Sequence, residues 1–229
     1  MKRSEINAAI DTARAELKKQ NITLPCFGYF TPDEWKEKKD LCDNVFSVML
    51  GWDVTDFDTD DFAHQGCVLF TVRNGSVDGA GVPYAEKYLI FNDTPSQAIP
   101  LHFHFKKTED IINRAGGVMC IEVYNSTPDG DLDRESDVTF YTDGIKNIVP
   151  AGTIVEITTG NSITLTPGLY HRIFVKEGTG MLIAGEVSSI NDDKTDNRFY
   201  APTARFCGVE EDEAPRYILA NEGVVLSGT

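Results

Sequence analysis

The sequence predicts a mainly β fold, a single barrel with helices packed outside it. From about residue 66 onward, short segments rich in β-branched and aromatic residues recur at a spacing of roughly 8–12 residues. Gly, Asn, Asp and Pro separate these segments, as they separate the strands of sandwiches and barrels. Hydrophobic residues make up 41 % of the 229 residues, which is enough to bury one substantial core.

The segments that we expect to form strands are, in chain order, CVLFTVRNG, YAEKYLIFN, QAIPLHFHF, GVMCIEVYN, DVTFYTDG, GTIVEITTG, SITLTPGLYHRIFV and GMLIAGEVSS. No long Pro- or Ser-rich linker divides the chain. We therefore expect one structural domain in three parts: an N-terminal helical arm at 1–65, the β-barrel at 66–190, and a C-terminal extension at 191–229 that closes the barrel.

Two helices are expected in the N-terminal arm. Ser4 can cap the first, which covers residues 1–20, and its apolar face is formed by Ile6, Ile10, Ala13 and Leu17. A second helix is expected from Thr31-Pro32-Asp33-Glu34 to about residue 48, because this tetrapeptide has the spacing of a capping box with Pro at the first helical position. The sequence GWDVTDFDTDDF then breaks the helical pattern, and we interpret it as a polar connection.

Composition excludes several classes of partner. The net charge of −15 and the pI of about 4.6 disfavour nucleic acid and anionic membranes, although an acidic balance mostly serves solubility. No stretch approaches the roughly 20 apolar residues of a membrane span, and the N-terminus lacks the apolar core of a signal peptide. The five cysteines form no CxxC pair, so reduced thiols in a cytoplasmic protein are expected.

Histidines and a glutamate indicate a metal site. His102 and His104 are two apart on an expected strand, so their imidazoles share one face. Glu109 follows the turn-like KKT, and His171 follows Pro167-Gly168 on a later segment. Nitrogen and oxygen ligands without thiolate suit Mn²⁺, Fe²⁺, Co²⁺, Ni²⁺ or Zn²⁺, with positions left for water or substrate. The alternative is an ordinary strand with two partly buried histidines.

The spacing of these residues resembles the two-part motif of the cupin superfamily. The first part is His102-x-His104-x4-Glu109-x6-Gly116, and the second is Pro167-Gly168-x2-His171 with Gly160 upstream. The resemblance implies a cupin-type β-barrel, a jelly roll, with the N-terminal helices packed outside. His64 lies outside the motif, and we expect it to be an ordinary surface or core histidine.

Longer segments resemble the bacterial D-lyxose ketol-isomerases along nearly the whole chain. These segments are LGWDVTDF, FTVRNG, YAEKYL, HFHFKKTEDIINRAGG, TPGLYH, and GEVSSINDD followed by DNRF. The resemblance implies a manganese-type divalent ion, a cytoplasmic homodimer, and interconversion of D-lyxose with D-xylulose, with slower action on D-mannose and D-fructose. The family's metal ligands fall on His102, His104, Glu109 and His171 without departure. Competing readings are a different metal-dependent cupin enzyme, such as a dioxygenase or epimerase, and a sugar-binding cupin without turnover.

An aldose–ketose isomerase moves a hydrogen between C1 and C2, either through a cis-enediol, which we favour, or by a metal-assisted hydride shift. Lys107 is the first candidate for proton transfer and sugar binding, because a cation near a divalent ion should have a lowered pKa. The resemblance also implies a lysine at this position. A solvated turn is the alternative, and Lys106 is the less favoured neighbour.

Other side chains complete the expected pocket. Lys87 shares a strand face with Ala85 and Leu89, so it can point inward and bind the sugar, although an outward position is also open. Glu109 can contact the sugar as well. The catalytic base is expected to be Glu211, carried over the metal by the C-terminal extension.

Glu186 is the next candidate for the base, and Asp192 and Asp193 follow it in a loop. Acidic runs such as the one that contains Glu211 are usually solvated. Arg205 and Phe199 are expected to help line the pocket and bind the sugar.

Overall fold

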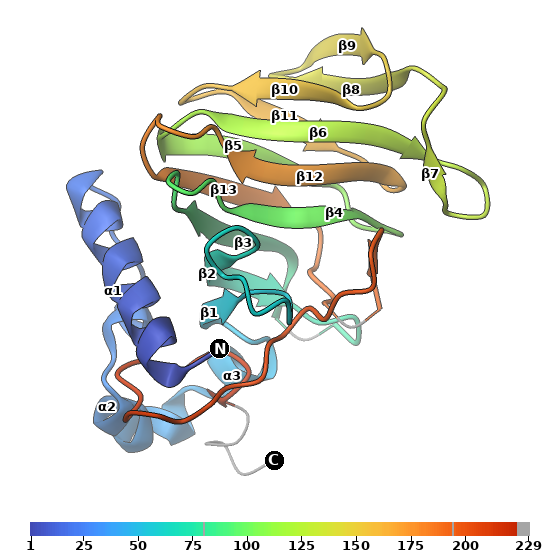
Figure 1. Ribbon diagram of the computed structural model, residues 1–229. Helices are drawn as coiled ribbons and strands as arrows, with labels where there is room; N and C mark the ends of the chain where they lie inside the picture. The colour runs from blue at the N-terminus through green and yellow to red at the C-terminus, as the bar shows by residue number, and fades with distance from the viewer. Residues whose placement is uncertain (80, 194, 224–229) are drawn as a thin grey trace.

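Two antiparallel sheets curl against each other and form the body of the protein (Figure 1). The computed structural model describes residues 1–79, 81–193 and 195–223. The larger sheet has the strand order β1-β2-β3-β13-β5-β11-β8-β9, and the smaller has the order β10-β6-β12-β4-β14, with β7 beside β6. Figure 1 shows β6, β12 and β4 in front of β5 and β13. The predicted mainly β, cupin-type fold is confirmed.

The helical elements are α1 (Arg3–Lys19), η1 (Cys26–Tyr29), α2 (Pro32–Lys38), η2 (Lys39–Leu41) and α3 (Asp43–Ser47). The strands are β1 (Gly51–Thr55), β2 (Cys67–Gly75), β3 (Gly81–Phe91), β4 (Ala98–His104), β5 (Glu109–Gly116), β6 (Met119–Ser126), β7 (Leu132–Asp133), β8 (Val138–Thr142), β9 (Ile145–Val149), β10 (Thr153–Ile157), β11 (Ser162–Leu165), β12 (Leu169–Val175), β13 (Leu182–Ser188) and β14 (Asn197–Phe199).

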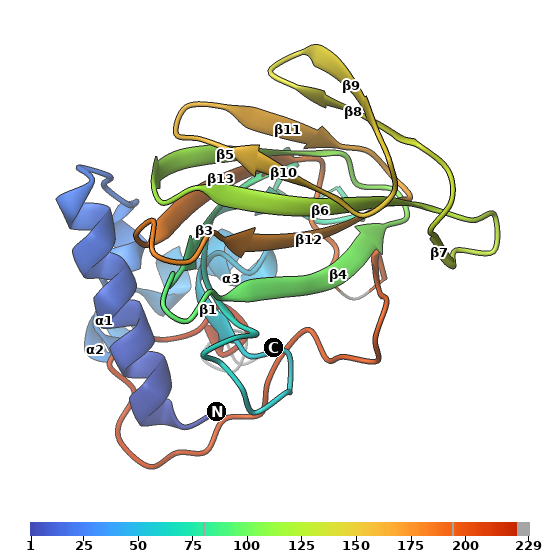
Figure 2. The ribbon, with the colours of Figure 1, turned by 45° about the horizontal axis from the view of Figure 1, so that its top comes forward.

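Helix α1 packs against the larger sheet, outside the sandwich (Figure 2). Its predicted apolar face is buried against a second core that includes Trp52 and Phe70. The predicted cap is wrong: Ser4 lies inside the first turn and bonds Asp212, while the backbone N–H of Lys2 donates to the Glu5 carboxylate at 2.8 Å. The pattern of apolar residues therefore identified the helix but not its first residue.

The second predicted helix is interrupted. Its capping box is present, with the Glu34 backbone N–H donating to Thr31 Oγ1 at 3.3 Å, but α2 ends at Lys38. A 3-10 turn and the short α3 follow it. Asp40 and Cys42, which lie in the break, are poor helix formers.

Five strands, β1, β5, β7, β9 and β14, lie outside the segments that were expected to form strands, and β1 and β5 show why. In β1, Trp52 and Val54 are buried, and the Trp52 indole N–H donates to the Gly28 carbonyl at 2.9 Å. In β5 the buried positions include Asn113 as well as Ile111, and Asp110 and Arg114 alternate with them. The polar residues of both segments hide the alternation that identifies a strand.

The C-terminal segment returns to the start of α1. The Arg3 backbone N–H donates to the Glu210 carbonyl at 2.8 Å, and the buried Arg3 guanidinium pairs with Glu211 at 2.6 Å and with Glu222. The same segment carries Phe199 and Arg205 on its way from the barrel to the helix. The two ends of the described chain are therefore held together by one buried cation.

All five cysteines are free thiols. Within 1–79, 81–193 and 195–223, no helix is long and apolar enough to cross a membrane.

The Arg3→Ala substitution should destabilise the fold. It leaves two carboxylates without their cation, and we expect the free energy of unfolding to fall by about 2 kcal/mol, less than for a fully buried pair because Glu211 is half exposed. Urea denaturation measures this. Arg216→Ala, which removes an exposed guanidinium from the same segment, is the control and should change the stability by less than about 0.5 kcal/mol. Equal effects of the two substitutions would contradict the role of Arg3.

Candidate functional site

Three buried histidines meet where β4 and β12 pair. His102 lies opposite His171 in the register of the two strands, and His104 lies two residues further along β4 on the same face. One ring nitrogen from each histidine can be chosen so that the three atoms all lie within 4.8 Å of one another. The two-residue spacing in the sequence thus produces a cluster that could hold a metal ion.

Backbone carbonyls orient two of these rings. Nδ1 of His102 lies 2.8 Å from the Pro100 carbonyl oxygen, and Nδ1 of His171 lies 2.9 Å from the Leu169 carbonyl oxygen. A carbonyl only accepts hydrogen bonds, so each Nδ1 carries the hydrogen and each Nε2 keeps its lone pair. Burial lowers the pKa of His102 well below its ordinary value of 6.5, and the neighbouring histidines lower this pKa further. A lowered pKa favours the neutral imidazole, which is the form that binds a metal.

Glu109 brings a carboxylate to the cluster from the first position of β5. Its Oε1 lies 3.1 Å from His171 Nε2 and 3.4 Å from His104 Nε2. Because His171 Nε2 has no hydrogen-bond partner among the residues that the structure describes, a lone pair and a carboxylate oxygen face each other in a buried space. A cation between them would satisfy both atoms, so the residues present fit a divalent metal.

Lys107 links Glu109 to a second buried carboxylate. Its Nζ lies 2.6 Å from Glu109 Oε2 and 2.9 Å from Glu186 Oε1. The turn that carries Lys107 is fixed by Asp196, whose carboxylate accepts the backbone N–H groups of Lys106 at 2.8 Å and Lys107 at 3.0 Å. Lys107 therefore points into the site, whereas Lys106 is exposed.

The lowered pKa expected for Lys107 depends on a bound divalent ion, and the protein's own groups act in the opposite direction. Burial lowers the pKa of this lysine, but Glu109 and Glu186 outweigh burial and raise it above the ordinary value of 10.5. The lysine with a lowered pKa is Lys87, because burial dominates there, while Glu186 and Asp193 oppose the shift. The sequence predicted Glu109 and Glu186 as site residues but not that both carboxylates pair with Lys107.

Lys87 and Glu186 face each other across β3 and β13. They are partners in the strand register, and Lys87 Nζ lies 3.7 Å from Glu186 Oε1. Burial would raise the pKa of Glu186, but Lys107 and Lys87 lower it below 4.5. Ser188 also donates to the same oxygen at 3.0 Å. Glu186 is therefore ionised at neutral pH, and the inward position of Lys87 predicted from Ala85 and Leu89 is present.

A cavity opens beside these groups, between the two sheets. His102, His104, Lys107, Glu109, Glu186 and Lys87 contribute its polar lining. Its apolar lining consists of Phe57, Leu69, Leu89, Ile99, Ile111, Ile173 and Phe199. The Phe199 ring lies 5.3 Å from that of His102. The polar groups can bond hydroxyls while the apolar wall contacts carbon atoms, a combination that suits a sugar.

Arg205, Asp193 and Asn191 line the same cavity. The Arg205 Nε lies 3.2 Å from Asp193 Oδ1, and Arg205 Nη1 lies 2.8 Å from Asp53 Oδ2. Burial would raise the pKa of Asp193, but Arg205 and Lys87 lower it below 3.8. Asp193 was one of several acids considered from the sequence, whereas Asp53 was assigned to a polar connection.

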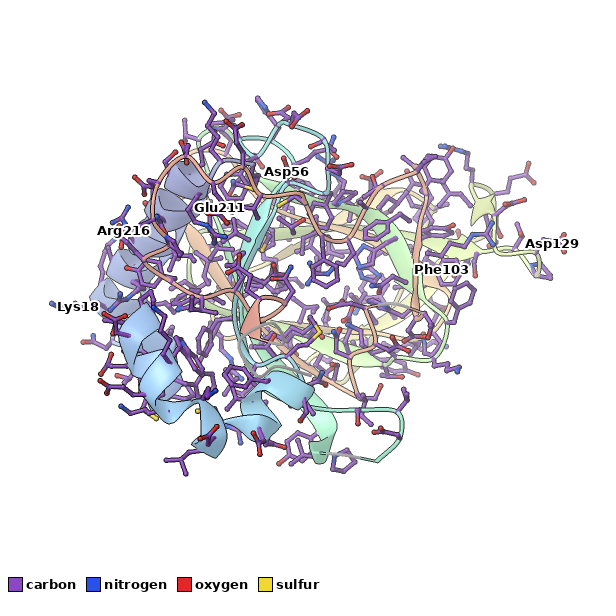
Figure 3. All side chains as sticks on the ribbon, turned by 90° about the horizontal axis from the view of Figure 1, so that it is seen from below. Lys18, Asp56, Phe103, Asp129, Glu211 and Arg216 are labelled. Atoms are coloured by element: carbon purple, nitrogen blue, oxygen red, sulfur yellow. The ribbon has the colours of Figure 1, made fainter. Side chains whose placement is uncertain are left out.

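Glu211 does not belong to this site. Its carboxylate is half exposed and pairs with Arg3, and Figure 3 shows it beside α1, well away from Phe103, which lies between the two histidines of β4. The C-terminal extension does supply Phe199 and Arg205 to the cavity, but its acidic run continues to the helix. Glu186, and not Glu211, is the candidate base whose carboxylate lies in the cavity, beside Lys107 and Lys87. His64 is exposed and pairs with Asp61 at 2.9 Å, as expected of a histidine outside the motif.

A family model described as D-lyxose isomerase matches residues 1–223. The chain belongs to the D-lyxose isomerase family. It is 42 % identical over 226 residues to a D-lyxose/D-mannose isomerase of Serratia proteamaculans, with 97 % of each chain covered. It is 40 % identical over 225 residues to a D-lyxose/D-mannose isomerase of Escherichia coli O157:H7, covering 97 % of this chain and 98 % of that one. The protein is therefore an aldose–ketose isomerase.

Solved structures of L-ribose isomerases share its fold. The enzyme of Geodermatophilus obscurus superposes with a TM-score of 0.60 at 15 % identity, and that of Acinetobacter sp. DL28 with a TM-score of 0.59 at 14 % identity. In both cases 92 % of this chain and 98 % of the other are covered. At this identity the likeness establishes the fold of this D-lyxose isomerase family member, and nothing about its substrate.

The Lys107→Met substitution tests the electrostatics of the site in chelated protein. In the wild type, the lowered pKa of Glu186 gives stability that is present above pH 4.5 and is lost as the pH falls below it. Without Lys107, burial raises the pKa of Glu109 and Glu186, so the variant loses stability as the pH rises.

We expect the stability difference between wild type and Lys107→Met to grow from about pH 5 to about pH 7, reaching about 3 kcal/mol. Urea denaturation at several pH values measures it. The exposed neighbour gives a matched control, since Lys106→Met should show a small effect without this pH dependence. A difference that does not change with pH would contradict the assignment.

Proposed function

We propose that this family member interconverts D-lyxose with D-xylulose, and D-mannose with D-fructose, with a divalent metal ion bound by His102, His104, Glu109 and His171. The observation that supports the proposal most strongly is the convergence of the neutral imidazoles and the Glu109 carboxylate beside a second ionised carboxylate, Glu186. The names of the two relatives at 40–42 % identity agree with these substrates.

The donor set suits Mn²⁺, Zn²⁺, Co²⁺, Ni²⁺ and Fe²⁺ alike, and the resemblance to the D-lyxose isomerases favours Mn²⁺ among them. When bound, the ion supplies positive charge that stabilises the negative charge developing on the oxygens at C1 and C2 of the open-chain sugar. The protein contributes a cavity between the two sheets and fixed imidazole orientations, with the carbonyls of Pro100 and Leu169 holding two of the three rings.

Glu186 is the catalytic base in this proposal. Its carboxylate is ionised at neutral pH and lies within the cavity, so it can take the proton from C2 and return it to C1 through a cis-enediol. Lys107 bonds both Glu186 and Glu109, and its permanent charge keeps Glu186 ready to accept a proton. Lys87, Arg205 and Phe199 then bind and orient the sugar.

A hydride shift would need no base at Glu186. Isomerisation in D₂O distinguishes the two routes, because only the enediol route exchanges the migrating hydrogen with solvent. A dioxygenase, an epimerase or a binding protein without turnover finds no support in the relatives from Serratia proteamaculans and Escherichia coli, since both are isomerases by name.

The resemblance alone supports two further parts of the proposal, a homodimer and a cytoplasmic location.

Protein from which a chelator has removed the metal should convert no D-lyxose, and added Mn²⁺ should restore turnover.

His102→Ala should lower the metal content below the one ion per chain expected of the wild type and should abolish turnover, because one of three imidazoles is lost. Elemental analysis measures the metal content. His64→Ala is the matched control and should keep both, since His64 is exposed and pairs only with Asp61. No conversion of either aldose by metal-loaded wild type would refute the proposed function.

Glu186→Gln should reduce kcat by about 10³-fold and abolish deuterium incorporation from D₂O, with the metal content unchanged. The amide has the size of the carboxylate but cannot accept the C2 proton. Glu211→Gln is the control and should change kcat by less than about twofold, because Glu211 pairs with Arg3 outside the cavity. The assay uses steady-state conversion of D-lyxose. A large loss in Glu211→Gln, with activity retained in Glu186→Gln, would reverse the assignment.

A further inference from the structure

A row of buried and partly buried charges of alternating sign extends from the histidine cluster. The row begins with Glu109, Lys107, Glu186 and Lys87, in which successive charges lie 2.6, 2.9 and 3.7 Å apart, and continues through Asp193, Arg205 and Asp53. Lys87 is the junction, because it interacts with both Glu186 and Asp193. The outer end of the row is formed by Arg205 and Asp53, which share the ion pair furthest along the row from Glu109.

A second cavity lies beyond that end. Asn191, Asp193 and Arg205 line both cavities, so these three residues form the wall between them. The inner cavity holds about 50 Å³ and the outer about 220 Å³. Asp53 lines only the outer one, so it touches the wall from behind.

The wall is fixed by the packing of Arg205. Both arms of its guanidinium face carboxylates, since Asp193 and Asp53 bind different nitrogens. The group also lies 4.7 Å from the centroid of the Phe206 ring, and Thr55 Oγ1 donates to the Arg205 carbonyl at 3.0 Å. Because two carboxylates hold its guanidinium, Arg205 is a rigid part of the wall. Its N–H groups can also donate to a sugar hydroxyl.

We propose that Arg205 sets the length of sugar chain that the site accepts, with Asp53 and Asp193 as the residues that position it. This rests on the proposed function, because C1 and C2 must lie at the metal end, beside Glu186. The remaining carbons then extend along Lys87 toward the wall. A pentose ends at Arg205, and the additional hydroxymethyl group of a hexose meets it. The outer cavity is the space into which a hexose would extend if the wall were shortened.

Arg205→Ala should therefore favour the longer sugar. We expect the ratio of kcat/KM for D-mannose to kcat/KM for D-lyxose to rise about fivefold or more, because one additional carbon in a confined site changes discrimination by roughly 10-fold or more. Arg205→Lys, which retains the charge and most of the length, should restore most of the wild-type ratio. Arg216→Ala, an exposed arginine on the same segment, should leave the ratio unchanged.

Asp53→Asn gives a second variant in case Arg205→Ala fails to fold. It keeps the size of the side chain and removes one carboxylate from behind Arg205, without touching the inner cavity. We expect the same ratio to rise about threefold, with a larger change in KM for D-mannose than in kcat for either sugar. A general loss of stability would reduce the activity on both sugars equally and leave the ratio constant.

Binding of sugar alcohols gives a readout that needs no turnover. Calorimetry with D-arabitol and D-mannitol on the metal-loaded protein should show the affinity ratio shifting toward the hexitol in Arg205→Ala and Asp53→Asn by about the same factors. Ratios within about twofold of wild type in both variants, in turnover and in binding, would overturn the proposal. If the wild type converts neither aldose, the proposed function fails, and the binding ratios still decide whether Arg205 limits chain length.

Discussion

The bridge from Lys107 to Glu109 and Glu186 is the interaction on which the rest of the site depends. Three charges buried together are tolerated only when each has close partners of opposite sign. Lys107 Nζ meets this condition at 2.6 and 2.9 Å. Because Glu109 and Glu186 belong to the paired strands β5 and β13, the same cation constrains strand register. A slip of one residue would turn one of these carboxylates to the other face of the sheet and leave a buried lysine unpaired.

The site also joins the two sheets. The histidines belong to the smaller sheet and the glutamates to the larger, so the spacing between the sheets fixes how closely imidazole and carboxylate approach. Apolar side chains that fill the sandwich, such as Leu89, Ile111 and Ile173, also line the cavity. Core packing is therefore part of the geometry of the site, and a substitution that leaves a void in this core would loosen the histidines and the carboxylates together.

The spacing of residues within one strand correctly predicted which side chains share a face of that strand. The two-residue spacing of His102 and His104 implies a shared strand face, and the alternation around Lys87 implies an inward side chain. What failed depended on partners distant in sequence. Nothing near Glu211 indicates that Arg3, 208 positions away, binds its carboxylate, and nothing near Lys107 indicates that Glu186 raises its pKa. The role of Asp53 in β1 was missed for the same reason, because its partner, Arg205, is distant in the sequence.

The ion pair between Glu211 and Arg3 gives the N-terminal helix a structural role next to the site. The segment from β14 to residue 223 forms part of the cavity through Phe199 and Arg205, yet this segment contains only one short strand. An irregular segment of this length loses much conformational entropy when it is ordered. Arg3 binds two of its carboxylates, and α1 is itself held by an apolar face on the larger sheet. The helix thus orders the segment that contributes Phe199 and Arg205 to the cavity, although the cavity lining includes no residue of α1.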